Sequence, residues 1–283
     1  MENKIFSDLK NKVCVITGGS GVLGSVMAKG LAEAGVKIAI LARNKERAES
    51  IAEEIQNSTG TEAIGISADV VDKQSLNNAK EIILKKFGKV DLLINAAGGN
   101  SPKATTKDEL ITDKNVDSLD STFFGLELEG FQKVFDLNIL GTLLPTMVFA
   151  KEMVENKSGA ILNVSSMSAY HPLTKIPAYS ASKSAINNFT EWLAVHFAKM
   201  NVRVNSIAPG FFLTNQNRFL LTDEKTNELT ERGNKIISST PMEKFGEPED
   251  LIGATLFLLS DSSKFITGVV LPIDGGFNAF SGV

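Results

Sequence analysis

Three glycines near the N-terminus are spaced as in a dinucleotide-binding turn. Gly19, Gly21 and Gly24 follow the apolar run 13–17 and match the pattern G-x-G-x-x-G. Glycine lets such a turn approach a pyrophosphate closely, and the helix that follows offers free N–H groups and a partial positive charge. A glycine-rich turn without a ligand is the alternative. The predicted cofactor contacts along this turn are Thr17, Gly18, Gly19, Ser20, Gly21, Val22, Leu23 and Gly24.

The end of the second apolar run indicates which cofactor is bound. An Asp or Glu about 20 residues after the glycines normally binds the ribose 2′-hydroxyl. This chain instead carries Arg43 followed by Asn44. A guanidinium can pair with a 2′-phosphate that a carboxylate would repel. We expect both residues to contact the cofactor and NADP(H) to be favoured over NAD(H). Alternatively, Arg43 is a solvated residue that stacks on adenine.

Short apolar runs alternate with helical patterns and must position these residues. Strands are expected at 13–17, 37–41, 63–68, 90–95, 160–164, 202–207 and 269–273, with helices at 22–35, 44–56, 73–87, 131–155, 178–200 and 248–259. Runs without polar alternation are typical of buried parallel strands, and the β-α-β-α order implies helices on both faces. We therefore predict an α/β fold with one Rossmann-type doubly wound domain over 1–283. Its central parallel sheet has about seven strands.

Irregular stretches interrupt this pattern at three places. Residues 99–130 and 210–247 are long polar excursions, and we expect both to form the substrate side of the site. Pro145 lies inside the predicted helix 131–155 and is expected to kink it or end it at the preceding residue.

Composition and charge exclude several classes of protein. Hydrophobic residues make up 43% and charged residues 22%, which excludes disorder, and the single Cys14 excludes an internal disulfide. A net charge of −4 argues against a nucleic-acid binder. The longest apolar segment, 139–150, is shorter than the roughly 20 residues of a membrane span. Two histidines without ligand spacing argue against a metal. We expect a cytoplasmic protein that binds neither nucleic acid nor membrane.

A tyrosine and a lysine one helical turn apart complete the chemistry. Tyr179 and Lys183 share one face of the predicted helix 178–200, and Ser166 follows a strand where a parallel sheet presents its ligand-binding loops. With these residues the chain resembles the short-chain dehydrogenase/reductase family. The resemblance covers nearly the whole chain. Its motifs are the glycine turn, Asn95-Ala96-Ala97-Gly98, Asn138, Ser166, the run from Tyr179 to Lys183, and Pro209-Gly210 with Thr214.

This resemblance implies an NAD(P)-dependent oxidoreductase that interconverts a keto group and a secondary alcohol. Tyr179 would give a proton to the carbonyl oxygen in reduction and remove it in oxidation, because Lys183 and the oxidised nicotinamide favour the phenolate. Lys183 would also hold the nicotinamide ribose, and Ser166 would orient the substrate oxygen. Asn138 would extend a proton relay through water. Ser165 is an alternative to Ser166, which lies at the family's usual interval before Tyr179.

Further cofactor contacts are implied in the same way. Asp69 and Val70 would meet the adenine, although Asp69 is equally well interpreted as an acid at a helix N-terminus. The other implied contacts are Asn95, Ala96, Ala97, Gly98, Pro209, Gly210, Phe212 and Thr214, together with Tyr179 and Lys183. Val22 stands where one-domain members usually carry glycine, a spacing closer to that of the extended members. The length of the chain and its Pro209-Gly210 segment favour the one-domain type.

Three segments, 97–106, 173–177 and 210–218, resemble a narrower group of the family, the D-mannonate oxidoreductase-like (fructuronate reductase-type) enzymes. This implies interconversion of a hexuronate such as D-fructuronate and an aldonate such as D-mannonate. A substrate with one carboxylate and many hydroxyls requires cations and amides, and Arg218 is the best carboxylate partner. The candidates are Asn100, Lys103, Ser166, His171, Lys175, Asn215, Asn217 and Arg218. Each loop residue could instead be merely solvated.

Other functions remain open from the sequence. A neutral polyol or ketose dehydrogenase and a 3-oxoacyl reductase belong to the same family. A non-catalytic NADP(H)-sensing regulator would be expected to lose the Tyr–Lys pair that this chain carries. The family's usual assembly implies a homotetramer formed through the helices that begin near Phe131 and Ala178.

Overall fold

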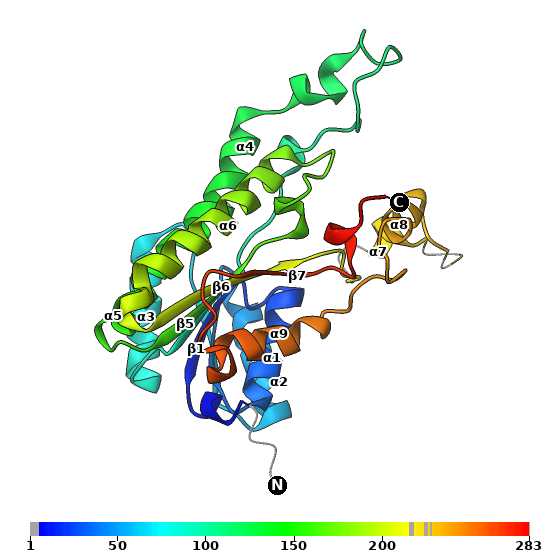
Figure 1. Ribbon diagram of the computed structural model, residues 1–283. Coiled ribbons are helices and arrows are strands. Elements are labelled where there is room, and N and C mark those ends of the chain that lie inside the picture. Colours follow the sequence, from blue (N-terminus) through cyan, green and yellow to red (C-terminus); the bar gives the residue numbers. More distant parts are fainter. Residues whose placement is uncertain (1–5, 215–217, 224–225, 227, 283) are drawn as a thin grey trace.

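The protein contains one parallel sheet of seven strands, seen in a computed structural model that describes residues 6–214, 218–223, 226 and 228–282 (Figure 1). The strands are β1 (Val13–Thr17), β2 (Lys37–Ala42), β3 (Ala63–Ser67), β4 (Leu92–Asn95), β5 (Gly159–Val164), β6 (Val202–Pro209) and β7 (Val270–Ile273). Their order is β3-β2-β1-β4-β5-β6-β7, and every neighbouring pair is parallel. The predicted doubly wound sheet is confirmed. The order reverses between β1 and β4, which is where such sheets bind ligands.

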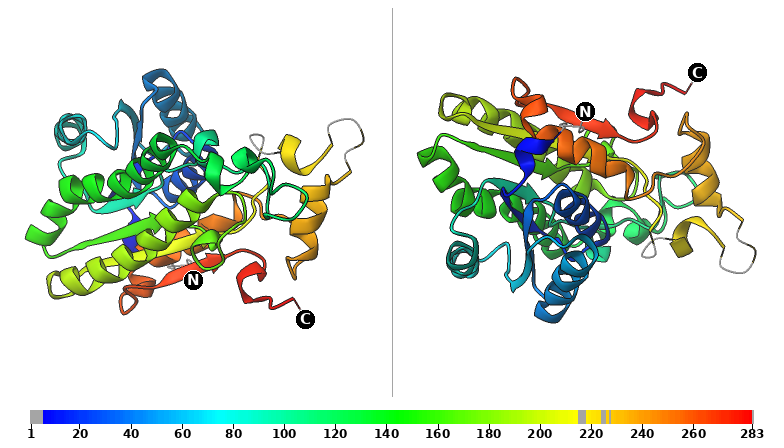
Figure 2. Two further views of the ribbon diagram at one scale, coloured as in Figure 1. Left: turned by 90° about the horizontal axis from the view of Figure 1, so that it is seen from above. Right: turned by 90° about the horizontal axis from the view of Figure 1, so that it is seen from below.

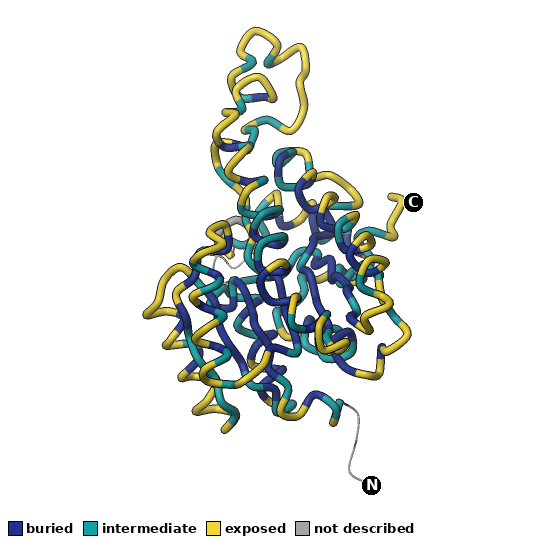
Figure 3. Tube along the Cα trace, turned by 90° about the vertical axis from the view of Figure 1, so that its left-hand side faces the viewer, coloured by how far each residue is buried: buried dark blue, intermediate teal, exposed yellow. Residues whose placement is uncertain are grey.

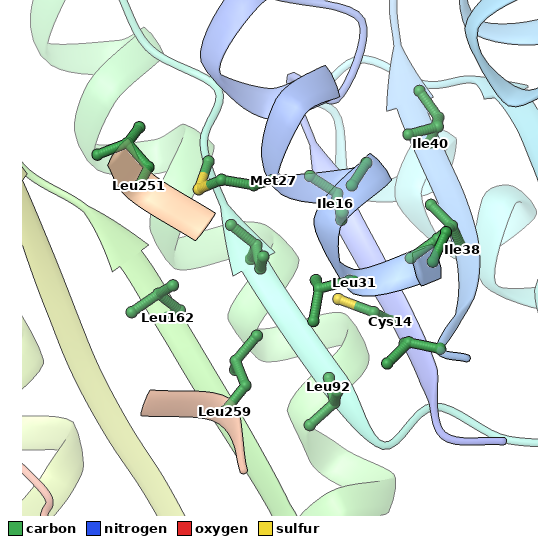
Figure 4. Close-up of a cluster of buried hydrophobic side chains, with 14 of the residues drawn as sticks. Cys14, Ile16, Met27, Leu31, Ile38, Ile40, Leu92, Leu162, Leu251 and Leu259 are labelled. Carbon is green, nitrogen blue, oxygen red and sulfur yellow. The ribbon is translucent and has the colours of Figure 1, made fainter. Parts of the chain in front are cut away.

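Helices cover both faces of the sheet. One face carries α1 (Val22–Glu33), α2 (Lys45–Thr59) and α9 (Asp250–Leu259), and the other carries α3 (Lys73–Phe87), α5 (Gly141–Glu155) and α6 (Pro177–Phe197). Successive strand residues point to opposite faces. Cys14 and Ile16 therefore pack under α1 and α9 (Figure 4), whereas Val13 and Val15 pack under the other layer.

Capping residues define where several helices begin and end. The Asn44 side chain accepts a hydrogen bond from the Arg47 N–H at 2.7 Å, so α2 begins one residue later than predicted. The Asp72 side chain caps α3 in the same way, accepting from the N–H groups of Gln74 and Ser75. Gly60 closes α2 with a positive φ of 71°, a conformation that glycine adopts without strain.

The discontinuity expected at Pro145 lies earlier in the chain. The helix α4 (Leu128–Phe135) passes through a π-helical turn at Asp136–Leu140 into α5, which continues through Pro145. The expectation that the helix ends before the proline was wrong, since α5 runs on to Glu155, and a kink at Pro145 stays a prediction. π turns of this kind are frequent at functional sites. By length and composition 128–155 could cross a membrane, but half of its most apolar window is buried inside the protein, as in a core helix.

The first excursion projects from the body of the molecule. We define residues 105–127 as the arm, which extends beyond α4 and is largely exposed (Figures 1 and 3). Its centre is held by Asp108, whose carboxylate accepts hydrogen bonds from Ser121 Oγ and Asn115 Nδ2. The second excursion carries the short helices α7 (Arg218–Leu221) and α8 (Glu231–Ser238). Both excursions lie beyond the same end of the sheet (Figure 2).

Candidate cofactor and active site

The glycine turn between β1 and α1 is built so tightly that side chains are excluded. A Cβ on Gly24 would lie 2.4 Å from the Gly18 carbonyl oxygen, and one on Gly18 would lie 2.8 Å from the Ala97 nitrogen. Gly18 also has a positive φ of 64°. Gly21 caps α1 without a side-chain hydrogen bond, which leaves the first N–H groups of the helix available for an anion. The turn therefore fits a dinucleotide pyrophosphate.

A cleft of about 350 Å³ opens at the carboxyl ends of the central strands. This volume lies within the range of ligand pockets, roughly 300–1,000 Å³. The cleft joins the glycine turn to the predicted catalytic residues. Its lining consists of Gly18, Gly21, Val22, Leu23, Gly24, Ala96, Gly98, Gly99, Val164, Ser165, Ser166, Tyr179, Lys183, Pro209, Gly210, Phe211, Phe212 and Thr214.

Ser166, Tyr179 and Lys183 meet on the wall of this cleft. Ser166 lies two residues beyond the end of β5 and caps the short turn Met167–Ala169, and the other two residues lie on α6. The Ser166 side chain lies close enough to the Tyr179 phenol to lower its pKa, and Lys183 Nζ lies 5.6 Å from the centre of the Tyr179 ring. The Ser166 hydroxyl also accepts hydrogen bonds from the Ser168 N–H and hydroxyl. A hydroxyl, a phenol and an ammonium thus share one small space, an arrangement suited to proton transfer.

Burial changes the acidity of both α6 residues. It raises the pKa of Tyr179 above its ordinary value, an effect partly offset by the Ser166 side chain. Burial lowers the pKa of Lys183 to about 8, because an ammonium loses hydration there. Lys183 Nζ still donates a 2.8 Å hydrogen bond to the Val164 carbonyl, which holds it at the cleft wall.

Asn138 lies behind the cleft in the π turn. Its side-chain amide bonds both groups of the Gly99 backbone, donating to the carbonyl at 2.8 Å and accepting from the N–H at 3.2 Å. It also donates to the Val134 carbonyl, and the residue is fully buried. A Cβ on Gly98 would lie 2.7 Å from Asn138 Oδ1 and 3.1 Å from Lys183 Nζ. Asn138 therefore fixes the Gly98–Gly99 segment against the lysine, while its role in a water relay stays a prediction.

Several predicted cofactor residues lie outside the cleft lining. Thr17 is buried, and its hydroxyl accepts from the N–H groups of Ala96 and Ala97, which holds that segment beside the turn. The Asn95 side chain is also buried and donates to Thr146 and Asn163 between strands. Gly19 packs the turn on β2, since a Cβ there would lie 2.9 Å from Ile40 Cδ1, and Ser20 is partly exposed.

The residues predicted near the adenosine half lie along the edge beyond β2 and β3. Arg43 and Asn44 are exposed at the end of β2. Val70 is buried against Gly141. The Asp69 carboxylate accepts from the Val71 N–H within the turn after β3, whereas the cap of α3 is Asp72. The interpretation of Asp69 as the acid at that helix N-terminus was therefore wrong by three residues.

The predicted substrate residues are dispersed around the excursions. His171 Nε2 lies 3.1 Å from the Asn278 carbonyl oxygen, so the ring contacts the C-terminal segment. Asn100 donates to Thr105 Oγ1, and Lys103 pairs with Glu127 and Glu129. Of the remaining candidates, Lys175 is partly exposed, Arg218 is exposed at the start of α7, and Asn215 and Asn217 lie outside the described residues.

Apart from Ser165, which was named only as an alternative to Ser166, three lining residues were not among the predicted cofactor or substrate contacts. Gly99 begins the first excursion, Val164 ends β5, and Phe211 packs edge-on against Phe277 from the C-terminal segment at 5.3 Å. Gly99 and Phe211 directly follow predicted motif residues, which was the available signal. The Phe277 contact joins distant parts of the chain and has no local signature.

Comparisons with known proteins agree with this geometry. Residues 12–225 match the short chain dehydrogenase family. An uncharacterised oxidoreductase of Bacillus subtilis, UxuB, is 51% identical over 280 residues and 99% of both chains. The structure of a candidate D-mannonate oxidoreductase from Haemophilus influenzae with bound NAD is 49% identical, covering 99% of this chain and 100% of its own, with a TM-score of 0.92. An NAD⁺-bound xylitol dehydrogenase is 30% identical over 95% and 99%, with a TM-score of 0.81. This chain is thus an oxidoreductase that belongs to the short-chain dehydrogenase family.

Proposed function

We propose that the protein interconverts the keto group of a hexuronate and the secondary alcohol of an aldonate with NAD(P), D-fructuronate and D-mannonate being the leading pair. The observation that carries the proposal is the meeting of Ser166, Tyr179 and Lys183 in the same cleft as the glycine turn. The nicotinamide, when bound, supplies or accepts the hydride. Side chains of this protein transfer the proton and orient the substrate. The similarity to the Haemophilus protein supports the choice of sugar acid.

Tyr179 is the proton donor in the direction of reduction. Because burial raises its pKa, the phenol keeps its proton near neutral pH and can give it to a carbonyl oxygen that gains negative charge. Ser166, which lines the cleft together with the phenol, holds that same oxygen and orients it. In oxidation the roles reverse, and the phenol must first lose its proton.

Lys183 makes that loss possible. With a pKa of about 8, the amine is about nine-tenths protonated at pH 7. An ammonium near the ring stabilises the phenolate by charge, and the low dielectric of a buried site strengthens the effect. The hydrogen bond to Val164 keeps the amine at the cleft, where it also holds the nicotinamide ribose.

The experiment is turnover of D-fructuronate with NADH and NADPH in parallel, compared with neutral ketoses and 3-oxoacyl thioesters. We expect the hexuronate to exceed the other substrates by about tenfold or more in kcat/KM, which is the discrimination that polar recognition provides. Equal or lower activity on the hexuronate would overturn the sugar-acid assignment while leaving the family unaffected.

The substrate carboxylate is assigned to Arg218, with Asn100, His171, Lys175 and Asn215 as further polar contacts. Arg218 is exposed at the start of α7, in the segment that leaves the cleft after Thr214, and its backbone N–H donates to the Thr214 carbonyl. We expect Arg218→Ala to weaken the binding of an acidic sugar more than that of a neutral polyol. An equal loss for both substrates would remove Arg218 from this role.

A preference for NADP(H) is proposed from Arg43. The guanidinium is exposed at the end of β2, where a 2′-phosphate can approach it. We expect Arg43→Gln to raise the Kd of NADPH and to leave that of NADH nearly unchanged. The Haemophilus relative holds NAD, which is the competing possibility. Tighter binding of NADH than of NADPH by the wild-type protein would overturn the proposed preference.

A neutral polyol dehydrogenase is the second candidate, favoured by the similarity to xylitol dehydrogenase. The substrate panel above separates it, because a polyol enzyme would oxidise xylitol faster than D-mannonate.

For either function we propose a cytoplasmic homotetramer. Exposed apolar side chains on α5 and α6, among them Met147, Trp192 and Val195, line or flank a groove of about 680 Å³. A monomer in size-exclusion chromatography with light scattering would contradict the tetramer.

A further inference from the structure

Each of the two excursions has a residue near its start in the cleft lining, and the two contact each other farther along the chain. Gly99, at the root of the first, and Thr214, near the root of the second, both line the cleft. Farther along, Glu109 on the arm forms an ion pair with Lys235 on α8, with 2.5 Å between Oε2 and Nζ. Both segments lie beyond the same end of the sheet (Figure 2). The Glu109–Lys235 pair therefore joins the segment that follows Gly99 to helix α8.

A second contact joins the arm to the catalytic side. The Thr106 N–H donates a 3.0 Å hydrogen bond to the carbonyl of Lys175, which lies in the segment between Ser166 and Tyr179. The arm is thus tied to the wall that carries the catalytic residues. Glu109 then connects that wall to α8.

Charge favours this contact. The arm contains six acidic and two basic residues, so it carries a net charge of −4, equal to that of the whole chain. Lys175 and Arg232 act on the Glu109 carboxylate together with Lys235, and these cations lower its pKa. The carboxylate is therefore ionised at neutral pH and faces cations from two different segments.

We propose that Glu109 and Lys235 form a clasp that holds the two walls of the cleft together and slows exchange of the bound cofactor. Both residues are positioning residues, since neither lines the cleft. The pair is exposed, so it shifts the balance between closed and open walls by up to about fivefold. This proposal relies on cofactor binding alone and holds for any substrate.

The test is the release rate of NADH or NADPH, followed by fluorescence after displacement with excess NAD(P)⁺. Glu109→Gln and Lys235→Gln should each speed release by up to about fivefold at low salt. The difference should vanish near 1 M salt, where the screening length is about 3 Å. The double variant Glu109→Gln with Lys235→Gln should release the cofactor no faster than either single variant, because each single variant already breaks the same contact. Lys114→Gln is the matched control, because this arm lysine takes part in none of the ion pairs found among the described residues.

A covalent version tests the same contact without relying on charge. Glu109→Cys with Lys235→Cys, bridged by a short bis-maleimide, should release the cofactor more slowly than either single cysteine variant after the same treatment. The native Cys14 is fully buried and its pKa is raised, so it does not react. Unchanged release in the single charge variants, additive acceleration of release in the double variant, or no effect of the bridge would each overturn the clasp. Inactivity on sugar acids would affect only the proposed substrate.

Discussion

Replacing Tyr179 by Phe is the sharpest test of the proposed chemistry. The substitution removes one hydroxyl and keeps the ring, which packs with Phe131 and Phe135 beside the buried Val134 and Ala178. The change therefore isolates the proton donor from the surrounding packing.

The expected magnitudes follow from the contacts. A positioned general acid contributes roughly 10²- to 10⁴-fold to the rate, so turnover should fall by at least two orders of magnitude. Ser166 keeps both of its hydrogen bonds to Ser168, and at most one interaction with the phenol is lost, so the free energy of unfolding should change by about 1 kcal/mol or less. The glycine turn and the Lys183–Val164 bond are untouched, and the Kd of the cofactor should stay within about threefold.

The assay measures kcat by cofactor absorbance and Kd by cofactor fluorescence on the same preparation. The chain offers a matched control, because Tyr170 is its other tyrosine and donates a hydrogen bond to the Val270 carbonyl outside the cleft lining. Tyr170→Phe loses one hydrogen bond of similar size and should keep near-normal turnover. If Tyr179→Phe also turns over at a near-normal rate, the phenol is not the proton donor and the reasoning fails.

Three further predictions follow from the site. Activity in reduction should fall as pH rises through about 8, because Lys183 then loses the charge that stabilises the phenolate left when Tyr179 gives its proton to the substrate. Lys183→Arg should move this fall in a pH–rate profile to higher pH. Gly24→Ala should abolish cofactor binding in a fluorescence titration, since its Cβ would lie 2.4 Å from a carbonyl oxygen, whereas Gly253→Ala on α9 meets nothing within 4 Å and should bind normally. Asn138→Ala should lower the urea-unfolding free energy by about 1–3 kcal/mol, because both groups of the Gly99 peptide lose their partners.

The sheet and the meeting of Tyr179 and Lys183 on one helical face were predictable because their signals are local. Buried parallel strands appear as uninterrupted apolar runs, and a spacing of four residues places Tyr179 and Lys183 on one helical face. Errors at helix ends are small and have local causes, such as the Asn44 cap that delays α2 by one residue. Pro145 shows a limit of prediction from sequence. The helix continues through this proline, and the α-helical pattern is instead interrupted at the π turn Asp136–Leu140, which has no strong sequence signature.

The substrate side was less predictable because its contacts join residues far apart in the chain. Glu109 and Lys235 are separated by 126 positions, and His171 and Asn278 by 107. Residue type alone proposed His171 and Lys103 as substrate contacts, yet the histidine lies against the Asn278 carbonyl and the lysine pairs with Glu127 and Glu129. A polar loop residue can form its hydrogen bonds and ion pairs within the protein, and its partner depends on how the loops fold.

Asn138 has a structural role that its motif did not indicate. The family resemblance implies a group in a water relay, which stays a prediction, and the structure shows its amide bonded to Gly99 and Val134. The buried amide holds Gly98 so close to Lys183 Nζ that an added Cβ would lie 3.1 Å from the amine. The position of the ammonium, which we propose to stabilise the Tyr179 phenolate, therefore depends partly on a side chain that does not line the cleft. A loss of activity in Asn138→Ala would thus reflect a displaced lysine unless the pH–rate profile stays unchanged.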